Sequence, residues 1–526
     1  MNQSASSATT KHERRAGAIA SAILCGFLLV LPSCGIPDRR EPMPGPDLPE
    51  KFDVRKANAT SDLPDVFEAS SGDNSAQVQI EEFYGDPLLT GLMHQAVLGN
   101  QEMRVLAEEV QIASNEIFSR SGTYLPFLFL GGGAGTDKPS LYTRAGAVDS
   151  TLNILPGVPI PTPLPDFVMG PTFFWTPDIW RQLHNARDAA AMRYFATAEG
   201  RSFSMSQLLA EIADNYYELM ALDNRLEILD QTIALMEQSL EVAKALKEAA
   251  RGTELGVLRF LAEVQKNQSE KLIVKQQIIE TENRINFLVG RFPQPVERST
   301  ADFIDLSLHT LGVGIPSQLL QNRPDIRQAE RQIAATGLDV KVARKAFLPV
   351  LTVTAGVGYE AFNPRYILVT PEALIANVVG NMIGPLVNKR AIQADFMNAD
   401  ARQLQALYNY QRVVINAFTE IVNRLSKVEN YRESIEIKKH QLEALEGSVE
   451  TASKLFQNAR AEYMDVLFAQ RDLRDARTVL VETKQQQLSA VVNTYQALGG
   501  GAYLSPVPPP STQKVHDFAF PGHVKH

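Results

Sequence analysis

Residues 414–456 read VINAFTEIVNRLSKVENYRESIEIKKHQLEALEGSVETASKLF, and they end a longer stretch, 391–456, that contains no proline. Apolar residues in it recur at steps of three, four or seven, which is the spacing of a coiled-coil seam rather than of a globular helix face. A helix over 391–456 would be about 100 Å long. The stretch therefore predicts a rod that spans a larger distance than one compact domain requires.

Composition and charge exclude several classes of function. The 526-residue chain is 44% hydrophobic and carries a formal net charge of -9, which argues against nucleic acid as a partner. Its two cysteines, Cys25 and Cys34, lie near the N-terminus, so the rest of the chain holds neither a disulfide framework nor a cysteine-based metal site. The eight histidines lack ligand spacing, and we find no nucleotide-binding loop or catalytic triad. We therefore expect no cofactor, no metal and no enzymatic activity.

The N-terminus reads as a targeting signal. A short basic run precedes the apolar segment 18–31, which is too short for a membrane span and has the size of a signal-peptide core. The segment ends in Leu-Pro-Ser-Cys-Gly, which resembles a bacterial lipobox. We expect residues 1–33 to be removed and Cys34 to become the first, lipid-bearing residue. The glycine after it is typical of sorting to the outer membrane, and the alternative is an ordinary signal peptide with an incidental cysteine.

Residues 34–82 are expected to be a lipidated tether followed by a strap over the folded body. Proline recurs through 37–49, which gives an extended segment that cannot be helical. Residues 50–80 are polar and lack periodicity.

The rest of the chain shows the same plan twice, over 83–290 and 315–499, with a connector over 291–314. Offset by 223 residues, the halves align without gaps over about 45 residues, and Leu125-Pro126 falls opposite Leu348-Pro349. We infer an internal duplication. The proline-rich residues 500–526 are expected to be a disordered tail.

Each half is predicted to contain a helix, two strands, a long helix and a return helix. In the first half these elements are expected over 86–120, 123–135, 167–180, 184–249 and from the following turn to 289. In the second half they are expected over 316–345, 347–359, 374–387, 391–456 and 461–498.

Four strands are too few to close a barrel. Each predicted strand has the length of about 9–11 residues that crosses a bilayer, but open sheet edges cannot face lipid. Either the four strands pack as a sheet away from lipid, or several chains pool them. Three chains would give twelve strands, an even number within the range of membrane barrels.

Residues 315–330 read IPSQLLQNRPDIRQAE, which resembles a signature of outer-membrane efflux lipoproteins of the TolC, OprM and NodT type. The segments YGDPLL at 84–89, ARKAFLP at 343–349 and ALGGG at 497–501 resemble further motifs of this family. The resemblance covers residues 31–503. It is most specific over Arg323, Pro324, Asp325 and Arg327, for which we predict a structural role: Pro324 starts a helix, and the arginines pair with neighbouring acids.

The resemblance implies a homotrimer that is mainly α-helical. Twelve pooled strands would form an outer-membrane β-barrel, and the helices would form a coiled-coil tunnel through the periplasm. The implied function is a passive outer-membrane channel of a tripartite, RND-type efflux system that exports drugs or other small molecules. Its partners would be a periplasmic adaptor, an inner-membrane RND pump and outer-membrane lipid. The alternatives are a channel for type I protein secretion and a periplasmic coiled-coil scaffold lipoprotein without a barrel.

The helix turns near residues 250 and 459 are expected to be the periplasmic tips, where the family closes its tunnel and meets its adaptor. Asp465 falls where related tunnels carry a gate carboxylate, and Glu462 lies one turn before it. An offset of 209 residues places Gly256 opposite Asp465, so the first half keeps only Glu254. Three copies would form acidic rings that favour cations. The alternative is that these residues are ordinary exposed helix charges.

Overall fold

The structure, a computed structural model, describes residues 36–49, 52, 75–299, 303–308, 312, 316–458 and 460–502. The predicted signal peptide, Cys34, most of the strap and nearly all of the C-terminal tail lie outside the described residues. The chain divides into two compact units, which are described separately. Unit 1 contains residues 1–43, 117–190 and 334–405, and unit 2 contains residues 44–116, 191–333 and 406–526.

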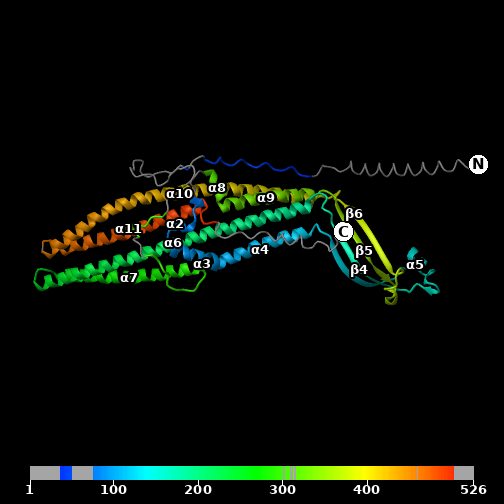
Figure 1. Ribbon diagram of the computed structural model, residues 1–526, viewed down its shortest axis with the longest axis horizontal. Coiled ribbons are helices and arrows are strands. Elements are labelled where there is room, and N and C mark those ends of the chain that lie inside the picture. Colours follow the sequence, from blue (N-terminus) through cyan, green and yellow to red (C-terminus); the bar gives the residue numbers. More distant parts are fainter. Residues whose placement is uncertain are drawn as a thin grey trace, which may run out of the picture. The chain divides into compact units, whose positions relative to one another are not determined.

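Unit 1 is built on a four-stranded antiparallel sheet with the order β1-β4-β5-β6 (Figure 1). Its strands are β1 Phe127–Asp137, β4 Leu164–Trp175, β5 Val350–Ala361 and β6 Leu374–Ile383. Phe127 pairs with Phe174, Phe174 with Thr354 and Val350 with Ile383. The connections carry four short elements that sequence reasoning missed, α5 Arg144–Asp149, β2 Asn153–Leu155, β3 Val158–Pro159 and η2 Pro364–Tyr366.

Two strands end earlier than the sequence suggested. The strand expected over 167–180 stops at Trp175, and the strand expected over 374–387 stops at Ile383. Pro177 and Pro385 follow these ends, and proline cannot donate to a ladder. Trp180 therefore lies outside the sheet, where its indole N–H donates to the Pro349 carbonyl at 2.7 Å.

Unit 2 is helical, and two hairpins dominate it. Figure 1 shows α6 running beside α7 and α10 running beside α11. The long helices α6 Gln182–Glu248 and α10 Arg390–Gln457 have 67 and 68 residues, and the return helices α7 Glu254–Val289 and α11 Tyr463–Leu498 have 36 each. The four helices lie within two residues of their predicted bounds. No helix in the described part of the chain is long and apolar enough to cross a membrane.

The first helix of each half is broken, which corrects the expectation of single helices over 86–120 and 316–345. The structure has α3 Pro87–Gly99, α4 Gln101–Gly122, α8 Pro316–Asn322 and α9 Pro324–Lys345. The breaks fall at Asn100 and Arg323, which are 223 residues apart. The Asn100 carboxamide accepts from the Met103 N–H at 3.0 Å, as a helix N-cap does. At the second break, Pro324 disfavours helical geometry in the residue before it.

The main core of unit 2 surrounds the end of α11. The short elements η1 Ser75–Gln77 and α2 Ile80–Tyr84 pack there, although α2 begins inside the segment expected to be strap. The Phe83 ring stacks on Tyr495 with centroids 3.9 Å apart, and the Tyr495 hydroxyl donates to the Val78 carbonyl at 2.6 Å. The predicted fold class is therefore confirmed in its mainly helical character, its four strands and its duplication.

Candidate functional site at the helix turns

The two helix turns lie together in unit 2 around a small apolar cluster. Phe260 on α7 faces Phe456 on α10 with ring centroids 6.1 Å apart, and both side chains are buried. A Cβ placed on Gly256 would lie 3.3 Å from the Tyr463 ring, so glycine permits a close approach of α7 to the start of α11. The cluster is completed by Leu240, Ala243, Val466 and Leu467.

The return helices begin at equivalent residues but are capped differently. Thr253 caps α7, and its hydroxyl accepts from the Gly256 N–H at 3.2 Å. Glu462, 209 residues later, is the N-cap of α11, and its N–H donates to the Asp465 carboxylate at 3.1 Å. Gly256 and Asp465 occupy the same position in the two helices, so the predicted pairing of these residues holds. The carboxylate of Asp465 thus has a capping role that sequence reasoning missed.

The structure separates the three predicted gate acids. Asp465 and Glu462 are exposed and lie on one turn of the second hairpin. Glu254 is exposed at the first hairpin, where it forms an ion pair with Lys247. The two exposed carboxylates on one turn can attract a cation, whereas the charge of Glu254 is already compensated.

The turns close through a left-handed residue. Ala250 has φ 56°, and the following Arg251 N–H donates to the Leu246 carbonyl at 2.8 Å. Arg460 N–H makes the equivalent bond to the Leu455 carbonyl, also at 2.8 Å. Alanine occupies this conformation at a cost that glycine would avoid.

The Arg323 guanidinium is buried inside unit 2. It forms a bidentate pair with Asp325 at 3.0 and 2.8 Å and an ion pair with Glu420 on α10 at 3.0 Å. Burial works against its charged form, but Asp325 and Glu420 outweigh that effect and raise the pKa of Arg323. Arg327 pairs with Glu199 at 2.7 Å. The arginines of the signature thus pair with acids, and Pro324 starts α9, as the structural interpretation predicts.

Arg323 also has a counterpart that sequence reasoning missed. It donates to the Ala497 carbonyl at 2.8 Å, and Asn100 donates to the Leu288 carbonyl at 2.8 Å. Leu288 and Ala497 are 209 residues apart, and each precedes the last residue of its return helix. The repeat offsets could have paired these residues in advance. Both halves therefore fix the end of the return helix to the break in the first helix.

Glycine is required where these helix ends meet. Gly290 and Gly499 cap α7 and α11 in the left-handed conformation, with φ 82° and 105°. A Cβ on Gly290 would lie 2.3 Å from the Gly99 carbonyl oxygen, and one on Gly499 would lie 2.6 Å from the Asn322 carbonyl oxygen. Only glycine satisfies both the backbone angle and the contact.

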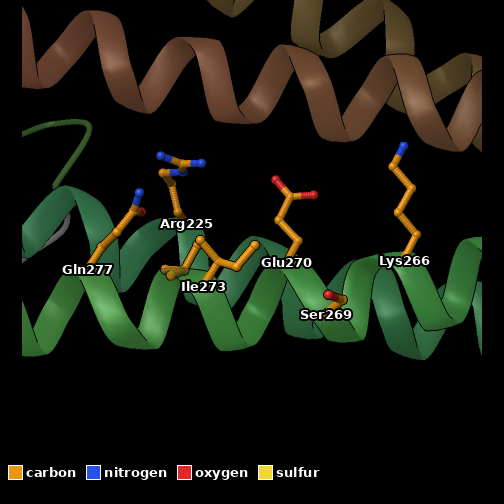
Figure 2. A pocket seen from close by; sticks show the side chains of 7 residues that line it. Arg225, Lys266, Ser269, Glu270, Ile273 and Gln277 are labelled. Carbon is orange, nitrogen blue, oxygen red and sulfur yellow. The ribbon is translucent and has the colours of Figure 1, made fainter.

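A groove of about 470 Å³ lies along α7 in unit 2 (Figure 2). Arg225 enters it from α6 and approaches Glu482 at 3.7 Å, while Lys266 and Glu270 enter it from α7. The lining mixes charged and apolar side chains without a nucleophile and base pair. Within the described ranges, no group of three or more His, Cys, Asp and Glu residues could hold a metal ion.

Known proteins with this pattern are channels. The family model described as outer membrane efflux protein matches residues 92–291 and 315–500. The cation efflux system protein CusC of Escherichia coli is 23% identical over 475 residues, which cover 90% of this chain and 97% of that protein. The pyoverdine export outer membrane protein OpmQ of Pseudomonas aeruginosa is 25% identical, and the match covers 80% of this chain and 86% of that protein.

A solved structure supports the same fold. A crystal structure of CusC, described in terms of folding and transmembrane channel formation, superposes with a TM-score of 0.75 at 21% identity. The match covers 88% of this chain and 99% of that chain. At this identity the likeness establishes the fold.

We predict that Arg323→Gln destabilises the helical unit by about 3 kcal/mol, because it leaves two carboxylates and a carbonyl without their buried cation. The midpoint of thermal unfolding, followed by helical circular dichroism, measures the loss. Arg344→Gln, on the exposed last turn of the same helix, is the matched control and should leave the midpoint unchanged. Equal midpoints for both variants would contradict the role assigned to Arg323.

Proposed function

Because this chain belongs to the outer membrane efflux protein family, we propose that it is the homotrimeric exit duct of a tripartite efflux pump. Family membership makes it an outer-membrane channel of an efflux system, with helices that extend into the periplasm, and not an enzyme. The proposal goes further in its partners, which are two more copies of this chain, a periplasmic adaptor and an inner-membrane RND pump. The cargo is drugs or other small molecules.

The edges of the sheet support the trimer. In one chain, β1 and β6 each have a neighbour on one side only. Unpaired backbone groups are costly in lipid, so these edges need partners there. Apolar side chains on both edge strands are also exposed, among them Leu130 at 83% and Val378 at 79%. Three copies would pair every edge and give twelve strands.

The duplication specifies how two copies would pair. Within one chain, β4 and β5 align Phe174 with Thr354 and Met169 with Tyr359. The repeat offsets convert this register into one between β6 and β1 of a neighbouring copy. The equivalent pairs are Ile383 with Gly131 and Val378 with Thr136.

The same conversion applies to the helices. In unit 2, α9 packs on α6, and a Cβ on Gly200 would lie 2.8 Å from the Gln328 side chain. Gln328 corresponds to Val105 on α4, and Gly200 corresponds to Tyr408 on α10. Val105 and Tyr408 are 59% and 40% exposed in one chain. Seven residues away along each helix, Leu98 and Ile415 are likewise exposed and apolar, so α4 of one copy fits α10 of the next as an antiparallel seam.

The gate proposal rests on Asp465 and Glu462. Their exposed carboxylates lie on one turn, and three copies at a constriction would form an acidic ring that favours cations. Glu254 contributes less, because Lys247 pairs with it.

The N-terminal proposal rests on Cys34. Its lipobox-like context and the outer-membrane location of the family favour acylation of this residue. The mass of the N-terminal peptide of the purified protein decides it, and an unmodified peptide that retains residues 1–33 would contradict it.

We predict that Val105→Cys combined with Tyr408→Cys links neighbouring copies through a disulfide in the outer membrane. Non-reducing gels should show dimers and trimers that dithiothreitol converts to the single chain. Val105→Cys with Asn423→Cys, which places the second thiol lower on α10, is the matched control. A chain that stays monomeric in both backgrounds would favour the scaffold alternative.

Deletion of this chain in its host should raise susceptibility to exported compounds, and the wild-type chain should restore resistance. The measurement is growth inhibition across a panel of drugs, with accumulation of a fluorescent pump substrate as a second readout. Loss of a secreted protein with unchanged drug susceptibility would instead support type I secretion.

We predict that Asp465→Asn reduces block of the open channel by divalent cations. The asparagine oxygen still accepts from the Glu462 N–H, so this variant removes the charge and keeps the cap. Asp465→Ala removes both and controls for capping. Single-channel conductance in planar bilayers is the measurement. If Asp465→Asn behaves as wild type and only Asp465→Ala differs, Asp465 is a cap and not a gate.

A further inference from the structure

Asp400 on α10 is a buried carboxylate whose contacts come from the N-terminal segment 36–49. Its residue is only 4% exposed. Arg40 approaches it with the guanidinium at 3.0 Å and the backbone N–H at 3.4 Å, and Arg39 lies at 3.9 Å. Arg39 also donates to Gln403, three residues further along α10. All of these residues belong to unit 1.

A buried carboxylate needs a cation, because an unpaired charge is costly away from water. Among the described residues, the ion pairs of Asp400 are formed by Arg39 and Arg40. If the segment left α10, Asp400 would lose these partners while staying partly enclosed. The segment is therefore part of the local structure of unit 1 and not a loose leader.

Apolar packing holds the same segment three residues earlier. Ile36 packs against a buried cluster in unit 1 that contains Phe347, at the end of α9, and Phe396 on α10. Within unit 2, the segment again contacts α10, where the Phe52 ring stacks on Phe418 with centroids 5.4 Å apart. A Cβ on Gly45 would lie 2.9 Å from the Gln411 side chain. Its prolines favour an extended conformation that suits a strand laid along a helix.

We propose that Asp400 is the docking site for the N-terminal segment, and that Arg39 and Arg40 clasp the segment to α10 there. The clasp fixes the position of the N-terminus. Residue 34 is two residues before Ile36 and so lies within about 7 Å of it. Phe347, which contacts Ile36, lies three residues before β5 begins at Val350.

The consequence for the membrane rests on the proposed function, because it assumes that Cys34 carries lipid. The acyl chains would then be held beside the start of β5, where α9 leads into the sheet. The clasp would transmit the pull of the lipid anchor to α10 through a charged contact rather than through a flexible leader. The clasp itself stands on the contacts and does not depend on acylation.

Trypsin cleavage after Arg39 and Arg40 in the purified, detergent-solubilised protein tests the clasp. Proteolysis of a folded protein follows local opening. We expect Asp400→Asn to be cut there about tenfold faster than wild type, because the opened segment no longer leaves a charge unpaired. Asp395→Asn, an exposed acid five residues earlier on α10, is the matched control and should be cut at the wild-type rate.

Charge exchange gives the decisive arm. The double variant Arg40→Asp with Asp400→Arg restores the pair in reverse, and cleavage after Arg39 should return to the wild-type rate. Cleavage after the exposed Arg251 at the first helix turn should be equal in all variants, which reports an intact fold. Equal rates for wild type and Asp400→Asn, or no recovery in the exchanged pair, would overturn the clasp. Loss of drug export with intact protection would instead count against the proposed function.

Discussion

Arg323 places a permanent positive charge inside the helical unit, where Asp325, Glu420 and the Ala497 carbonyl surround it. Those three groups come from the start of α9, the middle of α10 and the end of α11. One guanidinium therefore joins three helices that are distant in sequence, and its rigid fork provides enough donors to do so. A buried ion group of this kind costs desolvation, and its value lies in fixing one arrangement of the helices.

The duplication makes this arrangement recur with a neutral residue in the first half. Asn100 reaches the Leu288 carbonyl as Arg323 reaches the Ala497 carbonyl, and Gly290 and Gly499 close both return helices against the preceding break. Each half can thus position a hairpin, but neither half closes the sheet. The elements at the ends of the repeat, β1, α4, β6 and α10, keep exposed apolar or unpaired faces because their equivalents in the other half are covered within the chain. This asymmetry is the physical reason for expecting further copies.

The helix turns show how one residue type takes on two tasks. The first half caps its return helix with the Thr253 hydroxyl, while the second half uses the Asp465 carboxylate, which brings a charge to the turn. The charge is available for ions only because it stays exposed. Capping and ion attraction are therefore separable by a substitution that keeps the acceptor and removes the charge.

The sequence by itself determined the elements whose cause is local. Heptad spacing without proline defined α6, α7, α10 and α11 within two residues, and the 223-residue offset revealed the repeat. It also identified Arg323, Pro324, Asp325 and Arg327 as structural. Only the tertiary structure decided what depends on distant partners. The break at Asn100, the capping bond of Asp465 and the burial of Asp400 follow from groups that the chain brings together over long separations, and no local pattern encodes which partner a polar group will meet.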